Sequence, residues 1–109
     1  MVEPRSSRPV PPRGLTVDHG TDGIQLSGEL DTASVTQLAS ALKAAAHADT
    51  VSLDLAALTF IDSSGLRLLI ETHQRLEDDG RRLLLRRPSQ SVLRLLEISG
   101  VDGYLNLEP

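Results

Sequence analysis

The chain of 109 residues contains no cysteine, two aromatic residues and no long apolar run. The absence of cysteine excludes a disulfide framework and a thiolate metal site. The aromatic residues are Phe60 and Tyr104, so stacking on nucleic-acid bases has almost nothing to act through. No apolar run approaches the roughly 20 residues of a membrane-spanning helix. We therefore expect no direct membrane insertion.

Basic residues are outnumbered by acidic ones, and the net charge is −4. A general nucleic-acid binder gains most of its affinity by neutralising phosphates, so we expect no nucleic-acid partner. The hydrophobic content of 39% fits one globular domain with a core of its own. The first residues lack the apolar segment of a signal peptide, and we expect a cytoplasmic protein.

Proline is concentrated at the beginning of the chain, at positions 4, 9, 11 and 12. Such a segment has few backbone donors and buries little surface, so we predict a flexible Pro/Arg-rich arm over residues 1–14. A single domain is then expected over residues 15–109, with no internal repeat.

Residues 15–109 alternate between strand and helix patterns. Apolar residues recur at every second position in the expected strands and at every third or fourth position in the expected helices. Asp31 or Thr32 is expected to cap the first helix. The expected strands lie at residues 15–18, 24–27, 51–55 and 81–87, the expected helices at 31–49, 66–76 and 88–99, and a weak last strand or closing tail at 104–107.

The order of these elements predicts the fold class. Turn residues at 19–23 join the first two strands, which favours an antiparallel hairpin. The later strand–helix–strand units favour parallel pairing with right-handed crossovers. We therefore predict an α/β domain with a mixed central sheet of four to five strands and three or four helices. The segment after the third strand then lies at the carboxyl edge of the sheet, where sites in α/β folds gather.

That segment contains Asp62, Ser63, Ser64 and Gly65 directly before a helix pattern. Asp and Ser begin helices because their oxygens accept the free N–H groups of the first turn. The same N–H groups and the helix dipole favour negative charge. A hydroxyl at this position is therefore suited to carry a phosphate. The alternative is that Ser63 or Ser64 only caps the helix.

Several other side chains have a structural interpretation beside a functional one. Asp31 is expected either to cap the first helix or to contact a partner, and capping is also the structural interpretation of Asp62. Gly65 is expected to allow close packing or a special turn. Four arginines are expected to form a solvated rim of the fourth strand, with a docking surface as the alternative: Arg81, Arg82, Arg86 and Arg87.

The pattern around Ser63 does not indicate an enzyme. A nucleophilic serine needs a neighbouring base, and the histidines fall in a turn, a helix end and a helix face: His19, His47 and His73. The sequence has no Gly-x-Ser-x-Gly elbow and no Gly-rich phosphate loop ending in Lys-Ser or Lys-Thr. The histidines also lack metal-ligand spacing. We expect no catalytic residue, no cofactor and no metal.

Three motifs occur in order along the chain: Gly-Glu-Leu-Asp at 28–31, Phe-Ile-Asp-Ser-Ser-Gly-Leu at 60–66, and Val-Leu-Arg-Leu-Leu-Glu-Ile-Ser-Gly-Val at 92–101. With these motifs the chain resembles the STAS domains and, within them, the bacterial anti-sigma factor antagonists. The likeness covers residues 15–107. Any one motif is weak, but three in register with matching helices between them make a specific signal.

The resemblance implies a partner-switching module that is a monomer when free. Such an antagonist binds an anti-sigma factor that is also a serine kinase, and the sigma factor is released. The kinase then phosphorylates the hydroxyl residue after the motif's Asp, which maps onto Ser63, and a serine phosphatase removes the phosphate. The implied partner-binding residues are Asp31, Asp62, Ser63, Ser64, Gly65 and Arg67.

Arg67 departs from the family pattern, because many members have a small residue there. Its guanidinium is expected to lie in solvent, with a contact to the phosphate or to a partner as the alternative. A rival function within the same fold is a STAS subunit or scaffold without a phosphoserine cycle, for example in an ABC-type lipid transport complex. The intact run of residues 62–65 favours the phosphorylation switch.

Overall fold

The computed structural model describes residues 14–20, 23–45 and 47–109. Within these ranges the chain forms one five-stranded sheet, in the order β1-β2-β3-β4-β5, and three helices. Along the chain the elements are β1 (Leu15–Gly20), β2 (Gly23–Leu30), α1 (Val35–Ala44), β3 (Thr50–Ile61), α2 (Ser63–Asp78), β4 (Arg82–Arg86), α3 (Gln90–Ile98) and β5 (Asn106–Glu108). The predicted fold class and element order are confirmed.

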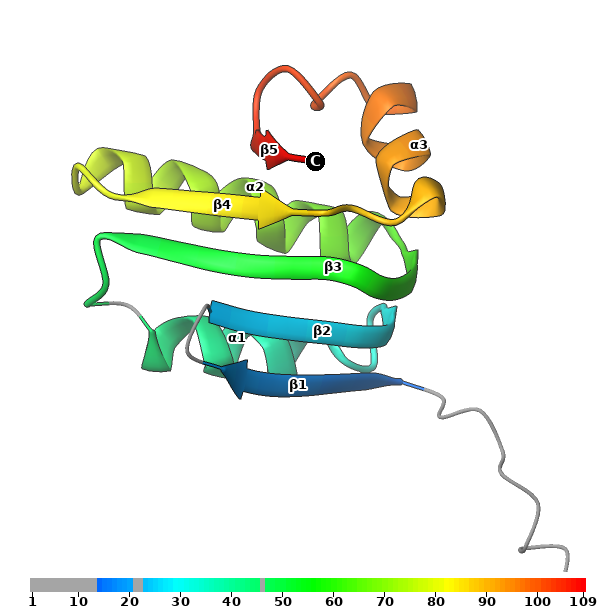
Figure 1. Cartoon of the computed structure of the whole chain (residues 1–109), viewed down its shortest axis with the longest axis horizontal. Helices are drawn as coiled ribbons and strands as arrows, with labels where there is room; N and C mark the ends of the chain where they lie inside the picture. The colour runs from blue at the N-terminus through cyan, green and yellow to red at the C-terminus, as the bar shows by residue number, and fades with distance from the viewer. Residues whose placement is uncertain (1–13, 21–22, 46) are drawn as a thin grey trace, which may run out of the picture.

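The sheet is mixed, as the sequence predicts. β1 pairs antiparallel with β2, whereas β2, β3, β4 and β5 pair parallel in succession. The carboxyl ends of β2 and β3 therefore lie at the same edge of the sheet (Figure 1), where Leu30 pairs with Ile61. The residues that follow these two strands meet at that edge.

Helices α1 and α2 cover one face of the sheet and lie behind the strands in Figure 1. Side-chain alternation along β3 directs Val51, Leu53 and Leu55 into this layer, where each is at most 3% exposed. The predicted apolar faces of the two helices meet these side chains, and their buried members are Leu38, Leu42, Leu69, His73 and Leu76. Full burial of one leucine contributes about 1.5–3 kcal/mol, so this layer fixes the helices against the sheet.

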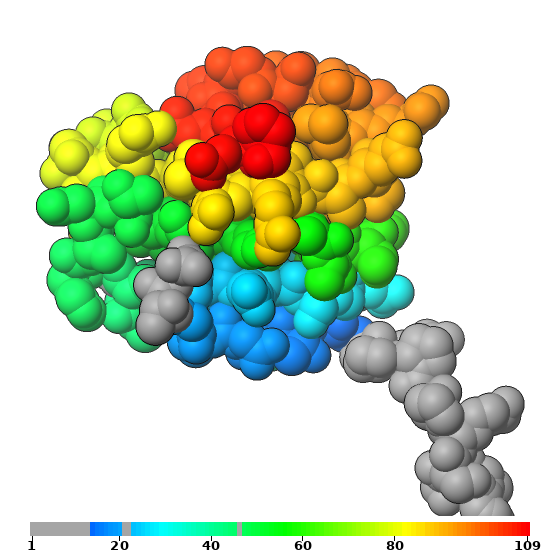
Figure 2. Space-filling view, in the orientation of Figure 1, coloured from blue at the N-terminus to red at the C-terminus, as the bar shows by residue number. Residues whose placement is uncertain are grey.

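Figure 2 shows the other face of the sheet, where strands from distant parts of the sequence lie side by side. Polar residues that alternate with the buried ones, such as Asp18 and Gln25, are exposed on this face. The sheet therefore has one apolar face and one polar face.

β3 is longer than the sequence predicts. The expected strand ended at Leu55, but β3 continues to Ile61 because β2 pairs with it along this whole length. The pairing contains register shifts, and residues 56–60 therefore lose the simple alternation that identifies a strand in the sequence.

α2 also begins earlier than predicted, at Ser63 and not at Leu66. Asp62 is its N-cap, so Ser63, Ser64 and Gly65 form the first turn of the helix. The interpretation of Ser63 or Ser64 as the helix cap is therefore wrong, and capping by Asp62 is confirmed.

The predicted start of the first helix is wrong as well. α1 begins at Val35 with Ser34 as its N-cap, because residues 31–34 form a turn in which the backbone N–H of Ser34 bonds to the carbonyl of Asp31.

The predicted arm lies outside the described residues except for Gly14, whose carbonyl accepts the backbone N–H of Glu29 at 2.9 Å. Residues 21–22 of the predicted turn also lie outside them.

Three of the four arginines expected to form a solvated rim have protein partners. Arg81 donates to the carbonyl of Ala48 from two nitrogens, at 2.9 and 2.7 Å. Arg86 pairs with Glu108 at 2.9 Å, and Arg87 pairs with Asp54. These side chains connect β4 to its neighbours. Because β4 is short, the residues at its two ends lie close to acceptor oxygens of adjacent strands and loops.

Candidate functional site

Asp62 organises the beginning of α2. Its Oδ1 atom accepts the backbone N–H groups of Ser64 at 2.9 Å and of Gly65 at 3.0 Å, and the hydroxyl of Ser64 at 2.6 Å. The hydroxyl of Ser64 and then the N–H of Gly65 are the main causes that lower the pKa of Asp62. Asp62 is therefore ionised at neutral pH and satisfies two of the free N–H groups of the first turn.

The two serines that follow Asp62 have different environments. The hydroxyl of Ser64 is half-buried, and it donates to Asp62 and bonds to the hydroxyl of Thr32 at 3.1 Å. Because Ser64 donates its single proton to Asp62, Thr32 is the donor in the second bond. Ser63 is exposed, and no hydrogen bond joins its hydroxyl to another part of the chain that the structure describes. Ser63 is thus the serine whose oxygen is free.

The loop after β2 contributes Asp31 to the same edge of the sheet. Oδ1 of Asp31 accepts the backbone N–H groups of Ala33 at 3.0 Å and of Ser34 at 3.1 Å. Ser34 is 4% exposed, and its hydroxyl donates to the carbonyl of Glu29 at 2.9 Å. The carboxylate of Asp31 therefore shapes its own turn, and Ser34 ties this turn to the end of β2.

Two contacts join this loop to the beginning of α2. The backbone N–H of Asp62 donates to the carbonyl of Leu30 at 3.1 Å, and the hydroxyl of Thr32 reaches Ser64. The surface that contains Asp31, Thr32 and Ser63 is consequently one unit, although its parts are some thirty positions apart in sequence.

Gly65 allows the helix to approach the sheet closely. A Cβ atom at this position would lie 2.7 Å from Cγ of Leu30 and 2.9 Å from Cγ1 of Ile61. Both distances are shorter than ordinary van der Waals contact. The expected role of Gly65 in close packing is confirmed.

Arg67 lies one turn after Ser63, on the side of α2 that faces α1. A groove of about 280 Å³ runs between the two helices. Its lining residues are Val35, Thr36 and Ala39 from α1, and Ser64, Arg67, Leu68 and Glu71 from α2. Arg67 is exposed and forms no ion pair with the described residues. The groove therefore combines apolar side chains of both helices with an available positive charge one turn after Ser63.

Phe60 lies at the same end of β3 and is 48% exposed. An aromatic side chain that is half exposed beside a polar loop is a common feature of protein-binding surfaces. Its neighbour in the sheet is Glu29 of the first motif.

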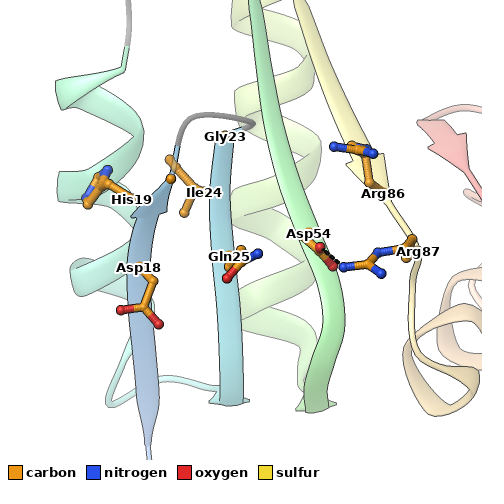
Figure 3. Close-up of a pocket in the computed structure, with 9 residues that line it drawn as sticks. Asp18, His19, Gly23, Ile24, Gln25, Asp54, Arg86 and Arg87 are labelled. Atoms are coloured by element: carbon orange, nitrogen blue, oxygen red, sulfur yellow. Dashed lines mark hydrogen bonds and ion pairs between the residues drawn. The ribbon is translucent and has the colours of Figure 1, made fainter.

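A second hollow lies on the polar face of the sheet, away from α2. Figure 3 shows Asp18, Gln25, Asp54 and Arg87 around it, and its volume is about 400 Å³. The hydrogen bond from Arg87 is the main cause that lowers the pKa of Asp54. None of the residues that line this hollow belongs to the three motifs. We interpret its ion pair as a connection between β3 and β4.

The three histidines do not converge on Ser63. His73 is buried on α2 with its ring 4.8 Å from that of Tyr104, His19 lies on β1, and His47 lies between α1 and β3. Within the described residues no group of His, Asp, Glu or Cys could hold a metal ion. In the same part of the chain, the helices are too short or too polar to cross a membrane.

Sequence reasoning underestimated Thr32 and missed Ser34. Both lie within three residues after the Gly-Glu-Leu-Asp motif, and Ser34 is a buried polar residue that fixes the loop. The predicted parallel pairing of the second and third strands places this loop beside Asp62, so the neighbourhood of Thr32 and Ser64 could have been inferred. The sequence carries no comparable signal for the burial of Ser34.

The sequence and the fold agree with those of a known family. The family model described as "Mlab, STAS domain" matches residues 15–109. The chain therefore belongs to the STAS domain family. A curated relative is the anti-sigma F factor antagonist of Lysinibacillus sphaericus, which is 33% identical over 85 residues, covering 75% of this chain and 73% of the relative.

Solved structures give the same result for the fold. The anti-sigma factor antagonist SpoIIAA in its unphosphorylated form is 27% identical with a TM-score of 0.69, covering 87% of this chain and 88% of that one. An anti-sigma factor antagonist from Mycobacterium paratuberculosis is 24% identical with a TM-score of 0.73, covering 87% of this chain and 84% of that one. The second likeness shows the fold alone. The predicted resemblance to STAS domains is confirmed.

Proposed function

We propose that this protein is an anti-sigma factor antagonist whose binding to an anti-sigma factor is switched off by phosphorylation of Ser63. The observation that carries the proposal is the free, exposed hydroxyl of Ser63 at the first position of a helix that Asp62 caps. The curated relative and SpoIIAA are both named as antagonists of this kind, and SpoIIAA has been solved in an unphosphorylated and in a phosphorylated form.

Ser63 is a better acceptor than Ser64 for a physical reason. The hydroxyl of Ser64 is bonded to Asp62 and Thr32, so two hydrogen bonds would have to break before it could enter a kinase active site. The hydroxyl of Ser63 can enter a kinase site without such a cost. There its oxygen would attack the γ-phosphorus of ATP, the bond to the bridging oxygen would break, ADP would leave and a kinase base would take the proton.

The phosphate would change the surface without unfolding the domain. It adds about −1.5 to −2 charge, which the N-terminus of α2 tolerates. The negative charge of the phosphate would lie beside the ionised Asp62 and the loop of Asp31. A partner surface fitted to a neutral hydroxyl would meet repulsion and the cost of desolvating a phosphate.

The partner-binding surface that we propose surrounds Ser63. It combines the loop after β2, the first turns of α2 and the groove between α1 and α2. Its members are Asp31, Asp62, Ser63, Ser64, Gly65 and Arg67, where Gly65 acts through packing because it is buried. A serine phosphatase would restore the free hydroxyl.

We infer that the domain acts by binding and not as an enzyme. Among the described residues, no histidine reaches the Ser63 hydroxyl, and Asp62 is occupied by three donors. Neither group is therefore available as a base for Ser63.

Affinity capture from a lysate of the source organism tests the binding half of this proposal. The baits are the wild type, Ser63→Ala, Ser63→Asp and the control Ser40→Asp, which adds the same charge at an exposed position of α1. We expect the wild type, Ser63→Ala and Ser40→Asp to retain an anti-sigma factor that is identified by mass spectrometry, and Ser63→Asp to lose it.

Two results would overturn the proposal. Equal retention of the same partner by all four baits would exclude a switch at Ser63. Capture of a lipid-transport ATPase instead of an anti-sigma factor would favour the alternative STAS function, a transport subunit without a phosphoserine cycle.

A further inference from the structure

Arg67 lies between the proposed phosphorylation site and an acidic residue on α2. Ser63 is four residues before it and Glu71 is four residues after it. Residues four apart on a helix are neighbours, with Cβ atoms about 5–6 Å from each other. In a helix the side chains lean toward the N-terminus, so Arg67 is directed toward the first turn and Glu71 toward Arg67.

Arg67 also lines the groove between α1 and α2. Ser64, which neighbours Ser63, lines the groove between α1 and α2 together with Arg67 and Glu71. The opposite wall of the groove comes from Val35, Thr36 and Ala39 of α1 and carries no charge. With Ser63 unmodified, the guanidinium of Arg67 is exposed and forms no ion pair with the described residues.

We propose that Arg67 binds the phosphate when Ser63 is phosphorylated, and that this contact withdraws the guanidinium from the groove. The inference rests on the proposed phosphorylation of Ser63 and adds a second consequence to it. The partner would lose a cation from the groove as well as meet a new negative charge.

The charge arrangement favours this contact. An acidic group four positions before a basic one is the favourable order on a helix. A dianionic phosphate with three acceptor oxygens is a stronger partner for a guanidinium than the single carboxylate of Glu71. Asp62 precedes Ser63 directly, and the loop of Asp31 is joined to the first turn of α2 through Thr32 and Ser64. Both carboxylates repel a phosphate, and Arg67, one turn after Ser63, can offset them.

The test uses protein in which phosphoserine is encoded at position 63, so that no kinase is needed. The second pKa of the phosphate is followed by ³¹P NMR in the phosphorylated wild type, Arg67→Gln and Arg75→Gln. Arg75 is an exposed arginine of the same helix, three turns from Ser63, and serves as the matched control. Asp62 and Asp31 are present in all three proteins, so their effect cancels.

We expect Arg67→Gln to raise the pKa of the phosphate by about 0.2–0.4 relative to the wild type, and Arg75→Gln to leave it unchanged. Equal titration of all three proteins would overturn the contact. That result would not affect the proposed phosphorylation of Ser63. The phosphorylation is tested separately, by measuring whether the wild type gains a phosphate when it is exposed to its kinase.

Methyl NMR tests the withdrawal from the groove. Val35 and Ala39 belong to α1 and are remote in sequence from position 63. We expect their methyl signals to shift when Ser63 is phosphorylated in the wild type, and to shift by less than half as much in Arg67→Gln. Equal shifts in the two proteins would show that Arg67 does not leave the groove.

Discussion

The hydroxyl of Ser64 donates to Oδ1 of Asp62 at 2.6 Å, while the neighbouring hydroxyl of Ser63 has no such partner among the described residues. Two adjacent serines are thereby separated into a structural one and a free one. The separation depends on the helix beginning at Ser63, because only then do Ser64 and Gly65 present their N–H groups to the capping carboxylate.

The first prediction concerns Ser64→Ala. The substitution removes the bonds to Asp62 and Thr32, so we expect a loss of about 0.5–1.5 kcal/mol in the free energy of unfolding. We also expect the pKa of Asp62 to rise toward its usual value without reaching it, since the two backbone N–H bonds remain. Urea denaturation and an NMR titration measure the two effects.

Ser40→Ala is the control for this prediction, because Ser40 is an exposed serine of α1 with no side-chain hydrogen bond to the described residues. It should change the stability by less than about 0.5 kcal/mol. If both variants are equally stable, the hydroxyl of Ser64 does not hold the site together.

The second prediction concerns Ser63→Asp. A negative charge at the first position of α2 interacts favourably with the helix dipole, by about 0.3–1 kcal/mol. We expect the melting temperature to be equal to or slightly above that of the wild type, as measured by circular dichroism. A large decrease would mean that the variant loses its partner by unfolding and not by a change of surface.

The third prediction concerns Gly65→Ala. The new methyl group would lie 2.7 Å from Leu30 and 2.9 Å from Ile61, and both are core residues that cannot simply rotate away. We expect a destabilisation of about 1–3 kcal/mol in chemical denaturation. The control Gly103→Ala meets no atom within 4 Å and should be neutral or stabilising by less than about 1 kcal/mol. Similar losses in both variants would argue against close packing at Gly65.

The fourth prediction concerns pH and the pair of Asp54 and Arg87. The pKa of Asp54 is lowered in the folded protein, so the pair contributes stability above the unfolded-state pKa and loses it as the pH falls through the folded-state pKa. We expect Asp54→Asn to cost about 0.5–1 kcal/mol at pH 7.

Below about pH 4 this difference should decrease toward zero, as measured by urea denaturation at pH 7 and pH 3. Asp102→Asn, at an exposed position without an ion pair in the described part of the chain, is the control. A difference for Asp54→Asn that is the same at both pH values would contradict the role of the charge.

The sequence was sufficient for the order of the elements because most strands alternate strictly and the helices have clear apolar faces. It was insufficient for residues 56–60, where register shifts in the pairing of β2 with β3 remove the alternation. The beginnings of α1 and α2 were also misplaced. Each position has several adjacent residues of the types Asp, Ser and Thr, and each of these types can cap a helix.

The site was predictable in part for a similar reason. Parallel strands bring the segments after β2 and β3 together, so Asp31 and Asp62 could be placed at one edge of the sheet. The different environments of Ser63 and Ser64 follow from a hydrogen bond between side chains, which depends on the exact start of the helix. The partners of Arg86 and Arg87 depend on the short length of β4, which the sequence does not specify.

The most direct test of the central claim is the intact mass of the protein after incubation with ATP and its captured anti-sigma factor. We expect the wild type and Ser64→Ala to gain one phosphate each and to be released from the partner, while Ser63→Ala gains none and stays bound. A phosphate on Ser63→Ala, or no phosphate on the wild type in a complex that remains intact, would contradict the claim that Ser63 is the switch.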